Sequence, residues 1–203
     1  MKIELVFATN NKHKLEEISK LLGDSFKLLS LSDIGCFDNI PEDQDTLEGN
    51  AFQKAKYVYD RFHKNCFADD TGLEVNALNG KPGVHSARYS EPDFPNLSGE
   101  KRSKANISKL LKELGDSNDR NAAFRTIICL IKNGNNYFFE GKVCGKIITL
   151  ERGSHGFGYD PVFVPEGYEN TYAEISLQEK NKISHRAKAI TKLIDFLSKQ
   201  LDK

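Results

Sequence analysis

Short apolar runs along the chain alternate with stretches in which apolar residues recur every three or four positions. The runs are rich in β-branched and aromatic residues and predict strands; they lie at 3–8, 26–31, 122–131 and 137–143. The periodic stretches predict amphipathic helices, at 15–22, 46–62, 100–114 and 183–197. Asn133-Gly134 between the last two runs predicts a hairpin. The pattern therefore predicts an α/β fold without internal repeats or an interdomain linker.

One apolar run leads directly into two adjacent carboxylates, in Phe67-Ala68-Asp69-Asp70-Thr71-Gly72-Leu73. We interpret 66–68 as a buried strand that ends at the aspartates, and 72–78 as a further strand. Neighbouring side chains on a strand point to opposite faces, but at a strand end both carboxylates can approach one ion. Mg²⁺ is commonly held by one or two carboxylates together with substrate phosphates. The alternative is that Asp69 and Asp70 only open a turn before Gly72, and this stretch alone does not decide between the two.

The first predicted strand is followed by the polar turn Thr9-Asn10-Asn11-Lys12-His13-Lys14 and then by a helix. The N-terminus of a helix presents N–H groups and a positive dipole end, which suit a phosphate, and Lys12 and Lys14 add cationic donors. The glycines of a P-loop are missing. The alternative is an Asn-capped helix with solvated lysines.

An acidic loop at 41–45 precedes the second predicted helix, which Thr46 can cap. Glu42 in this loop is our candidate for a third metal carboxylate, although the loop can equally be a solvated turn. Asn50 and Lys54 lie four positions apart in the helix, so they share one face.

The segment 153–161 contains three glycines and two aromatic residues, a composition more suited to a pocket than to a core. Glycine lets the backbone approach a ligand closely, and Phe157 offers a stacking surface for a base. Lys180, His185 and Arg186 lie before and within the first turns of the last predicted helix.

The 203 residues suit one domain, which we place at 1–203 with two lobes. Lys plus Arg and Asp plus Glu both number 29, and this balance argues against a nonspecific nucleic-acid binder. We find neither a signal peptide nor an apolar run of the roughly 20 residues that span a membrane. Four scattered cysteines without a CxxC pair predict reduced thiols in a cytoplasmic protein.

These segments, in this order, resemble the inosine/xanthosine triphosphate pyrophosphatase (Ham1-like) family over nearly the whole chain. Six motifs carry the resemblance: Ala8–Lys14, Thr46 with Asn50-Ala51 and Lys54-Ala55, Ala68–Leu73, Pro82-Gly83 with Ser86–Ser90, Gly156–Pro161, and Ser184-His185-Arg186. Asn10 stands where many members have Gly, and Thr71 where many have Ser.

The resemblance implies an elongated mixed sheet flanked by helices, in two lobes with a central cleft, and a homodimer. It implies Mg²⁺-dependent hydrolysis of ITP, dITP and XTP to the monophosphate and pyrophosphate. Such hydrolysis needs a base for water and a metal at the phosphates. Asp70 is our candidate for base and metal ligand, with Asp69 and Glu42 as further ligands. The predicted substrate-binding residues are Thr9, Asn10, Asn11, Lys12, His13, Lys14, Lys54, Thr71, Phe157, Gly158, Tyr159, Asp160, Lys180, His185 and Arg186.

Two other functions compete with this prediction. A Maf-type nucleotide pyrophosphatase would have a related fold and other substrates, but the segment from Phe157 to Asp160 and the pair His185-Arg186 favour the purine-selective family. A catalytically silent nucleotide-binding protein would not need so many carboxylates close to phosphates.

Overall fold

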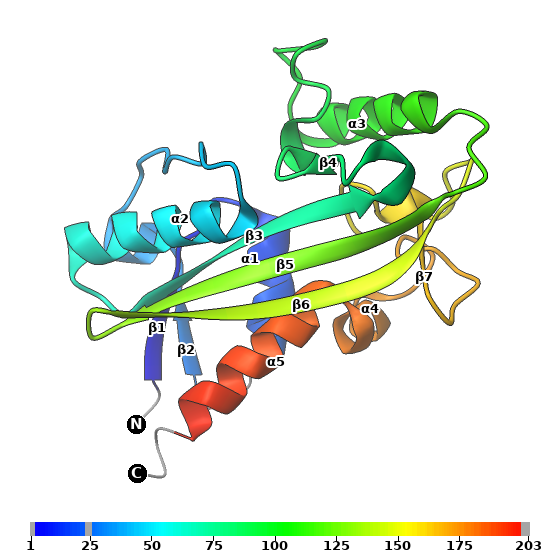
Figure 1. Ribbon diagram of the computed structural model, residues 1–203. Coiled ribbons are helices and arrows are strands. Elements are labelled where there is room, and N and C mark those ends of the chain that lie inside the picture. Colours follow the sequence, from blue (N-terminus) through cyan, green and yellow to red (C-terminus); the bar gives the residue numbers. More distant parts are fainter. Residues whose placement is uncertain (1–2, 23–25, 200–203) are drawn as a thin grey trace. The chain divides into compact units, whose positions relative to one another are not determined.

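The computed structural model describes residues 3–22 and 26–199, which form two compact units (Figure 1). Unit 1 contains the described residues up to Asp70, Thr126–Gly141, and those from His185 onward. Unit 2 contains Thr71–Arg125 and Lys142–Ser184. Three strands have residues in both units: β3 (Cys66–Val75), β5 (Asn121–Lys132) and β6 (Asn135–Ile147).

Unit 1 is a mixed sheet with helices on both faces. Besides its parts of the three shared strands, its elements are β1 (Ile3–Phe7), α1 (Lys12–Leu21), β2 (Phe26–Leu29), a 3-10 turn at Ser32–Ile34, α2 (Leu47–Phe62) and α5 (His185–Ser198). The strand order is β2-β1-β3-β5-β6. β1 pairs in parallel with β2, Ile3 opposite Phe26, and with β3, Val6 opposite Cys66. The last residue of β1, Phe7, lies opposite Phe67, so the chain that leaves β1 continues beside the residues of β3 that follow Phe67.

Side chains of β3 alternate between the two faces of the unit 1 sheet. Phe67 stacks on Phe7 with ring centroids 4.6 Å apart, in a core shared with Ile18 of α1 and Ile190 of α5. Cys66 points the other way, and its Sγ donates to the carbonyl of Ala55 in α2 at 3.2 Å. One face of β3 is therefore covered by α1 and α5, and the other by α2.

Unit 2 packs two helices and two short strands on its parts of β3, β5 and β6. Its own elements are β4 (Pro82–Gly83), α3 (Gly99–Leu114), β7 (Phe163–Pro165), α4 (Leu177–Ile183) and 3-10 turns at Asn76–Leu78, Ser86–Arg88 and Asp160–Val162. β4 and β7 run antiparallel to β3 and β6. In its core, Ile107 and Leu110 of α3 join Leu73 and Phe163.

The predicted α/β fold with a mixed sheet flanked by helices is confirmed. Two predicted element boundaries, at the aspartates and at the last helix, are wrong. β3 does not end at the aspartates but continues to Val75, so the strands expected at 66–68 and 72–78 are one strand followed by a 3-10 turn. The last predicted helix is interrupted at Ser184, which is extended (φ −68°, ψ 155°) between α4 and α5. Lys180 and Arg186 therefore lie on different helices.

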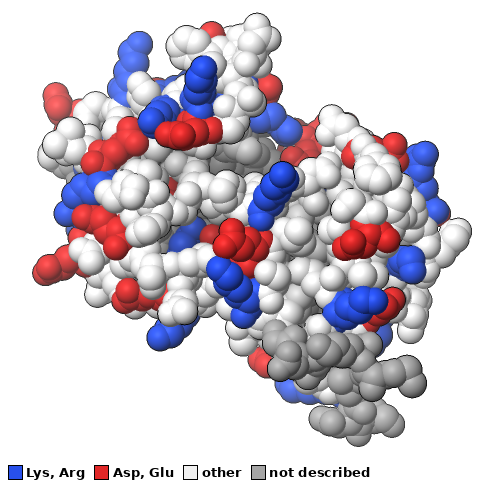
Figure 2. All heavy atoms as spheres, turned by 180° about the vertical axis from the view of Figure 1, so that it is seen from behind, with Lys and Arg blue, Asp and Glu red and all other residues white. Residues whose placement is uncertain are grey.

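All four cysteines of the described chain have free thiols; Cys36, Cys66 and Cys129 are buried, whereas Cys144 on β6 is exposed. Across residues 3–22 and 26–199, we find no helix with the length and hydropathy to cross a membrane. On the face of the molecule that Figure 2 shows, positive and negative side chains are interspersed.

Candidate active site

The turn between β1 and α1 is held by its own polar side chains. Asn11 is the N-cap of α1, and its Oδ1 accepts from the N–H groups of His13 and Lys14 at 3.0 and 3.2 Å. The N–H of Asn11 donates to Thr9 Oγ1 at 3.2 Å. Asn10, Lys12 and His13 are exposed. The cap fixes Lys14 in the first turn, with its side chain directed at β3.

Asp69 projects from β3 toward α1 and α5, on the same face as Phe67. Its carboxylate accepts from Lys14 Nζ at 2.9 Å and from Arg186 Nε at 3.1 Å. Arg186 also donates to Glu17 of α1, and the side chains of Asp69, Arg186 and Glu17 are almost fully buried. Burial alone would raise the pKa of Asp69, but the cations Lys14, Arg186 and Lys54 outweigh it and hold this pKa well below its usual value. Asp69 is therefore a permanent anion between two cations.

Asp70 projects from the opposite face of β3, toward α2. Its Oδ2 accepts from the side-chain amide of Asn50 at 3.0 Å, and Lys54 Nζ lies 3.8 Å from its Oδ1. Lys54 also donates to Glu42 in the loop before α2. Burial raises the pKa of Asp70, against the opposing effects of Lys54, Lys14 and the Asn50 hydrogen bond. A carboxylate with a raised pKa is better suited to take a proton than one that is fully ion-paired.

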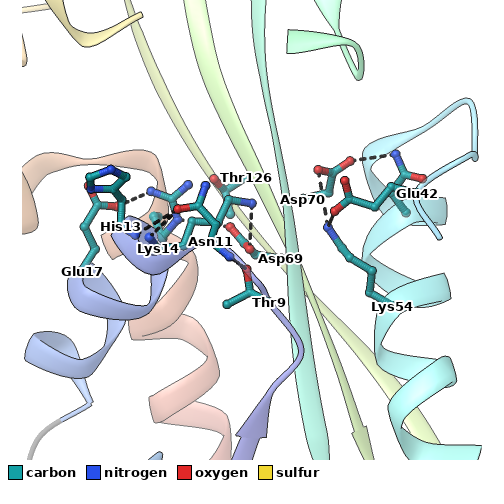
Figure 3. Close-up of polar contacts among 12 residues, drawn as sticks. Thr9, Asn11, His13, Lys14, Glu17, Glu42, Lys54, Asp69, Asp70 and Thr126 are labelled. Atoms are coloured by element: carbon teal, nitrogen blue, oxygen red, sulfur yellow. Dashed lines mark hydrogen bonds and ion pairs between the residues drawn. The ribbon is translucent and has the colours of Figure 1, made fainter. Parts of the chain in front are cut away.

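Figure 3 shows that Asp69 turns toward Lys14 and Thr9, whereas Asp70 turns toward Lys54 and Glu42. In residues 3–22 and 26–199, no three His, Cys, Asp or Glu side chains gather as a metal-binding group. β3 continues through both aspartates and keeps its alternation, so in this structure Asp69 and Asp70 point to opposite faces of the sheet. Asp70 and Glu42 both form ion pairs with Lys54, and two carboxylates with phosphate oxygens suffice for a hard cation.

Three predicted substrate-binding residues of unit 2 form a second cluster. Lys180 of α4 donates to Asp160 Oδ2 at 2.6 Å, and the same oxygen accepts from the N–H of Phe157 at 2.8 Å. The Lys180 ammonium lies over the Phe157 ring, 4.9 Å from its centroid. Gly156, at φ +75°, has no room for a side chain, since a Cβ there would lie 2.0 Å from Asp160 Oδ2. The structure thus brings Phe157, Asp160 and Lys180 together.

Other predicted residues are placed differently. Tyr159 is buried, with its hydroxyl donating to the carbonyl of Ser86 at 3.0 Å, so only its backbone is available to a ligand. Gly158 adopts φ +64° beside it, and Thr71 follows Asp70 on β3 as a partly buried residue. His185 and Arg186 belong to unit 1, with Asp69, whereas Phe157 belongs to unit 2.

Among the described residues of unit 1, three buried polar residues were not predicted as site residues: Glu17, Asn50 and Thr126. Glu17 lies three positions after Lys14 and interrupts the apolar face of α1. An acidic residue at that position was the signal in the sequence for a buried charged group. Asn50 shares a face with Lys54, as the spacing indicated, and Gln44 N–H donates to its Oδ1 at 2.9 Å. Thr126, inside an apolar strand, has no such signal in the sequence.

The fold is that of solved proteins of the Ham1 family. The structure matches the Ham1 protein of Staphylococcus aureus with a TM-score of 0.84 at 37% identity, over 97% of this chain and 99% of that one. It matches a HAM1 protein from Coxiella burnetii with a TM-score of 0.86 at 34% identity, over 97% and 99%. The Ham1 family model matches residues 5–196, so the chain belongs to the Ham1 family.

Curated relatives of similar length carry a specific name. The dITP/XTP pyrophosphatase of Flavobacterium psychrophilum is 54% identical over 96% of this chain and 98% of its own length. The dITP/XTP pyrophosphatase of Porphyromonas gingivalis is 51% identical over 96% and 97%.

Proposed function

We propose that this protein hydrolyses the non-canonical purine nucleoside triphosphates ITP, dITP and XTP to the monophosphate and pyrophosphate. Such an enzyme removes deaminated purines from the nucleotide pool. The names of the relatives support the substrate class. The observation that carries the chemistry is Asp70, whose carboxylate is buried, held by Asn50 and adjacent to Lys54 and Glu42.

The triphosphate end of the ligand belongs, in our proposal, to unit 1. The capped turn Thr9–Lys14 offers the positive end of α1, and Lys14 and Lys54 offer two ammonium groups. Asp70 takes a proton from the attacking water, and Lys54 beside it balances the negative charge on the phosphate oxygens. Asp69 orients Lys14 and does not itself exchange a proton.

The cofactor in this proposal is Mg²⁺, held by Asp70 and Glu42. When bound, such an ion neutralises phosphate oxygens and lowers the pKa of a coordinated water. The residues fit the ion because Asp70 and Glu42 supply carboxylate oxygens, and their shared partner Lys54 shows that the two carboxylates are neighbours. Substrate phosphates and water complete such sites. Asp69 is engaged by Lys14 and Arg186, and we propose only an indirect role for it at the ion.

The base, in our proposal, stacks on Phe157 and meets polar groups of the segment from Phe157 to Asp160, Lys180, His185 and Arg186. Lys180 occupies one face of the Phe157 ring, so a purine stacks on the other. Thr71 adds a hydroxyl close to Asp70 in the sequence. We further propose a cytoplasmic homodimer that acts on free nucleotides, without nucleic-acid or membrane partners.

The bond that is cut provides the first test. With ITP or XTP and Mg²⁺, we expect one pyrophosphate and one monophosphate per turnover, detected by ion-exchange chromatography with and without added inorganic pyrophosphatase. Addition of EDTA should abolish turnover, and Mg²⁺ in excess of the chelator should restore it. Orthophosphate with a nucleoside diphosphate as products, or turnover that persists in EDTA, would refute the reaction or the metal role. Cleavage of non-purine nucleotides in preference to ITP would favour a Maf-type enzyme.

The second test concerns the two lysines of the proposed phosphate site. Lys14→Met and Lys54→Met keep most of the side-chain volume but lose the ammonium. Since a hydrogen bond to a charged group contributes about 1.5–3 kcal/mol, we expect kcat/KM to fall about 10- to 100-fold for ITP, XTP and ATP alike. Lys56→Met is the control, because Lys56 lies on the same helix as Lys54 but is exposed and pairs with Asp60. If either variant instead changed the preference among bases, the lysine would contact the base and not the phosphates.

A further inference from the structure

We propose that Thr126 is a positioning residue for base selection: its hydroxyl holds the His185 imidazole in the tautomer that carries the proton on Nε2. The inference rests on the proposed function, because it assigns to His185 the reading of a purine oxo group. Thr126 itself contacts neither substrate nor metal in this scheme. It acts through the ring that it orients.

The contact between the two side chains is short and buried. Thr126 lies in the unit 1 part of β5 and has 0% of its surface exposed, and His185 is also buried, at 3%. Thr126 Oγ1 lies 2.6 Å from His185 Nδ1. Because 59 residues separate them in the sequence, this hydrogen bond fixes the ring against the sheet and not against its own helix.

The backbone of His185 is fixed by the neighbouring strand. Gly141 of β6 lies so close that a Cβ there would be 1.9 Å from the His185 carbonyl oxygen and 2.6 Å from the Ala189 nitrogen. His185 is the first residue of α5, after the extended Ser184, whose N–H donates to the Lys180 carbonyl at 2.8 Å. Backbone and ring of His185 are therefore both held by the hairpin of β5 and β6.

The chemical consequence concerns the other ring nitrogen. In a neutral imidazole one nitrogen donates and the other accepts, and a hydrogen bond to one nitrogen determines the state of the other. When the Thr126 hydroxyl donates to Nδ1, Nε2 carries the proton and is a donor. A donor suits the 6-oxo group of hypoxanthine or xanthine and faces another donor in the 6-amino group of adenine. The tautomer that is protonated on Nε2 thus favours the binding of ITP and XTP over that of ATP.

The first arm of the test examines the ring without any substrate. In full-length protein labelled with ¹⁵N-histidine, two-bond ¹H–¹⁵N spectra distinguish a protonated from an unprotonated ring nitrogen, and His185→Gln identifies the signals. We expect an unprotonated Nδ1 in the wild type, and displaced Nδ1 and Nε2 signals in Thr126→Val, which keeps the shape but removes the hydroxyl. Thr126→Ser, which retains the hydroxyl, should restore the wild-type pattern.

The second arm measures kcat/KM for ITP and ATP. From the usual net contribution of one hydrogen bond, we expect the ITP-to-ATP ratio of kcat/KM to fall about tenfold in Thr126→Val. The fall should come from a lower kcat/KM for ITP. Thr126→Ser should retain the ratio. Thr171→Val is the matched control, because Thr171 is an equally buried threonine of unit 2 whose hydroxyl donates to the Arg152 carbonyl at 2.9 Å. Its ratio should be unchanged.

Three results would overturn the proposal: a proton on Nδ1 in the wild type, His185 signals that do not move in Thr126→Val, or an unchanged ITP-to-ATP ratio in a folded Thr126→Val. A wild type that does not hydrolyse ITP would overturn the proposed function, and the role in base selection with it. The spectra would then still decide whether Thr126 holds the ring, so the two failures are distinguishable.

Discussion

Replacing Asp70 by Asn is expected to abolish most of the pyrophosphatase activity while leaving the fold intact. The variant keeps the side-chain shape, and its amide oxygen can still accept from Asn50. It cannot take a proton from water, and its NH₂ group would face the Lys54 ammonium, which now lies 3.8 Å from a carboxylate oxygen. Loss of a general base alone costs about 10²- to 10⁴-fold in rate, and weaker metal binding adds to that loss. Initial rates with ITP at saturating Mg²⁺ measure the effect.

The control for this variant is Asp60→Asn, which makes the same chemical change at an exposed residue of α2 paired with Lys56. It should retain wild-type kinetics. We also expect the thermal unfolding of Asp70→Asn to be close to that of the wild type, since a neutral amide is easier to bury than a carboxylate. Near-normal turnover in a folded Asp70→Asn would show that another group activates the water. Asp69→Asn should also lower the activity, because it releases Lys14.

Arg186→Ala is expected to have the largest effect on stability. The guanidinium is buried between Asp69 and Glu17, so its removal leaves two buried carboxylates without their shared cation. Breaking a buried ion pair in this way costs about 3–5 kcal/mol, a large part of the roughly 5–15 kcal/mol that stabilises a typical protein. We expect the unfolding midpoint to fall by about 6–20 °C, from the usual 2–4 °C per kcal/mol for chains of this size. Arg61→Ala, at an exposed arginine near Asp38, should unfold like the wild type.

Arg186 is also one of the predicted substrate-binding residues, and we propose that it contacts the 6-oxo group of the base. A test of that role needs a variant that remains folded. Glu17→Gln combined with Arg186→Met removes one of the two carboxylates together with the cation, and leaves Asp69 paired with Lys14. We expect this double variant to regain part of the lost stability. If Arg186 reads the base, ITP turnover should still be low while weak ATP turnover changes little. If the preference for ITP over ATP survives in the folded double variant, base reading lies in other residues.

The sequence by itself determined the elements and most of the local chemistry. Periodicity predicted α2 and α3, because a helix that buries one face must repeat its apolar residues at the helical period. Apolar runs rich in β-branched and aromatic residues predicted β1, and Asn133-Gly134 predicted the hairpin of β5 and β6. The caps at Asn11 and Thr46 were predictable for the same local reason, since each bonds N–H groups two or three residues away. The Ham1 family followed from the order of six motifs.

Only the tertiary structure decided how the charged residues are paired. Whether Asp69 and Asp70 converge or diverge depends on whether β3 continues past them, and the pairing of Leu73 with Gly83 of β4 keeps the strand extended there. Arg186 reaches Asp69 across 117 residues of sequence, and Thr126 reaches His185 across 59. Such contacts are set by the packing of α1 and α5 on one face of the sheet and of α2 on the other. The periodicity of the sequence predicts which face of an element a residue occupies. It does not predict which side chain, distant in the sequence, the residue contacts there.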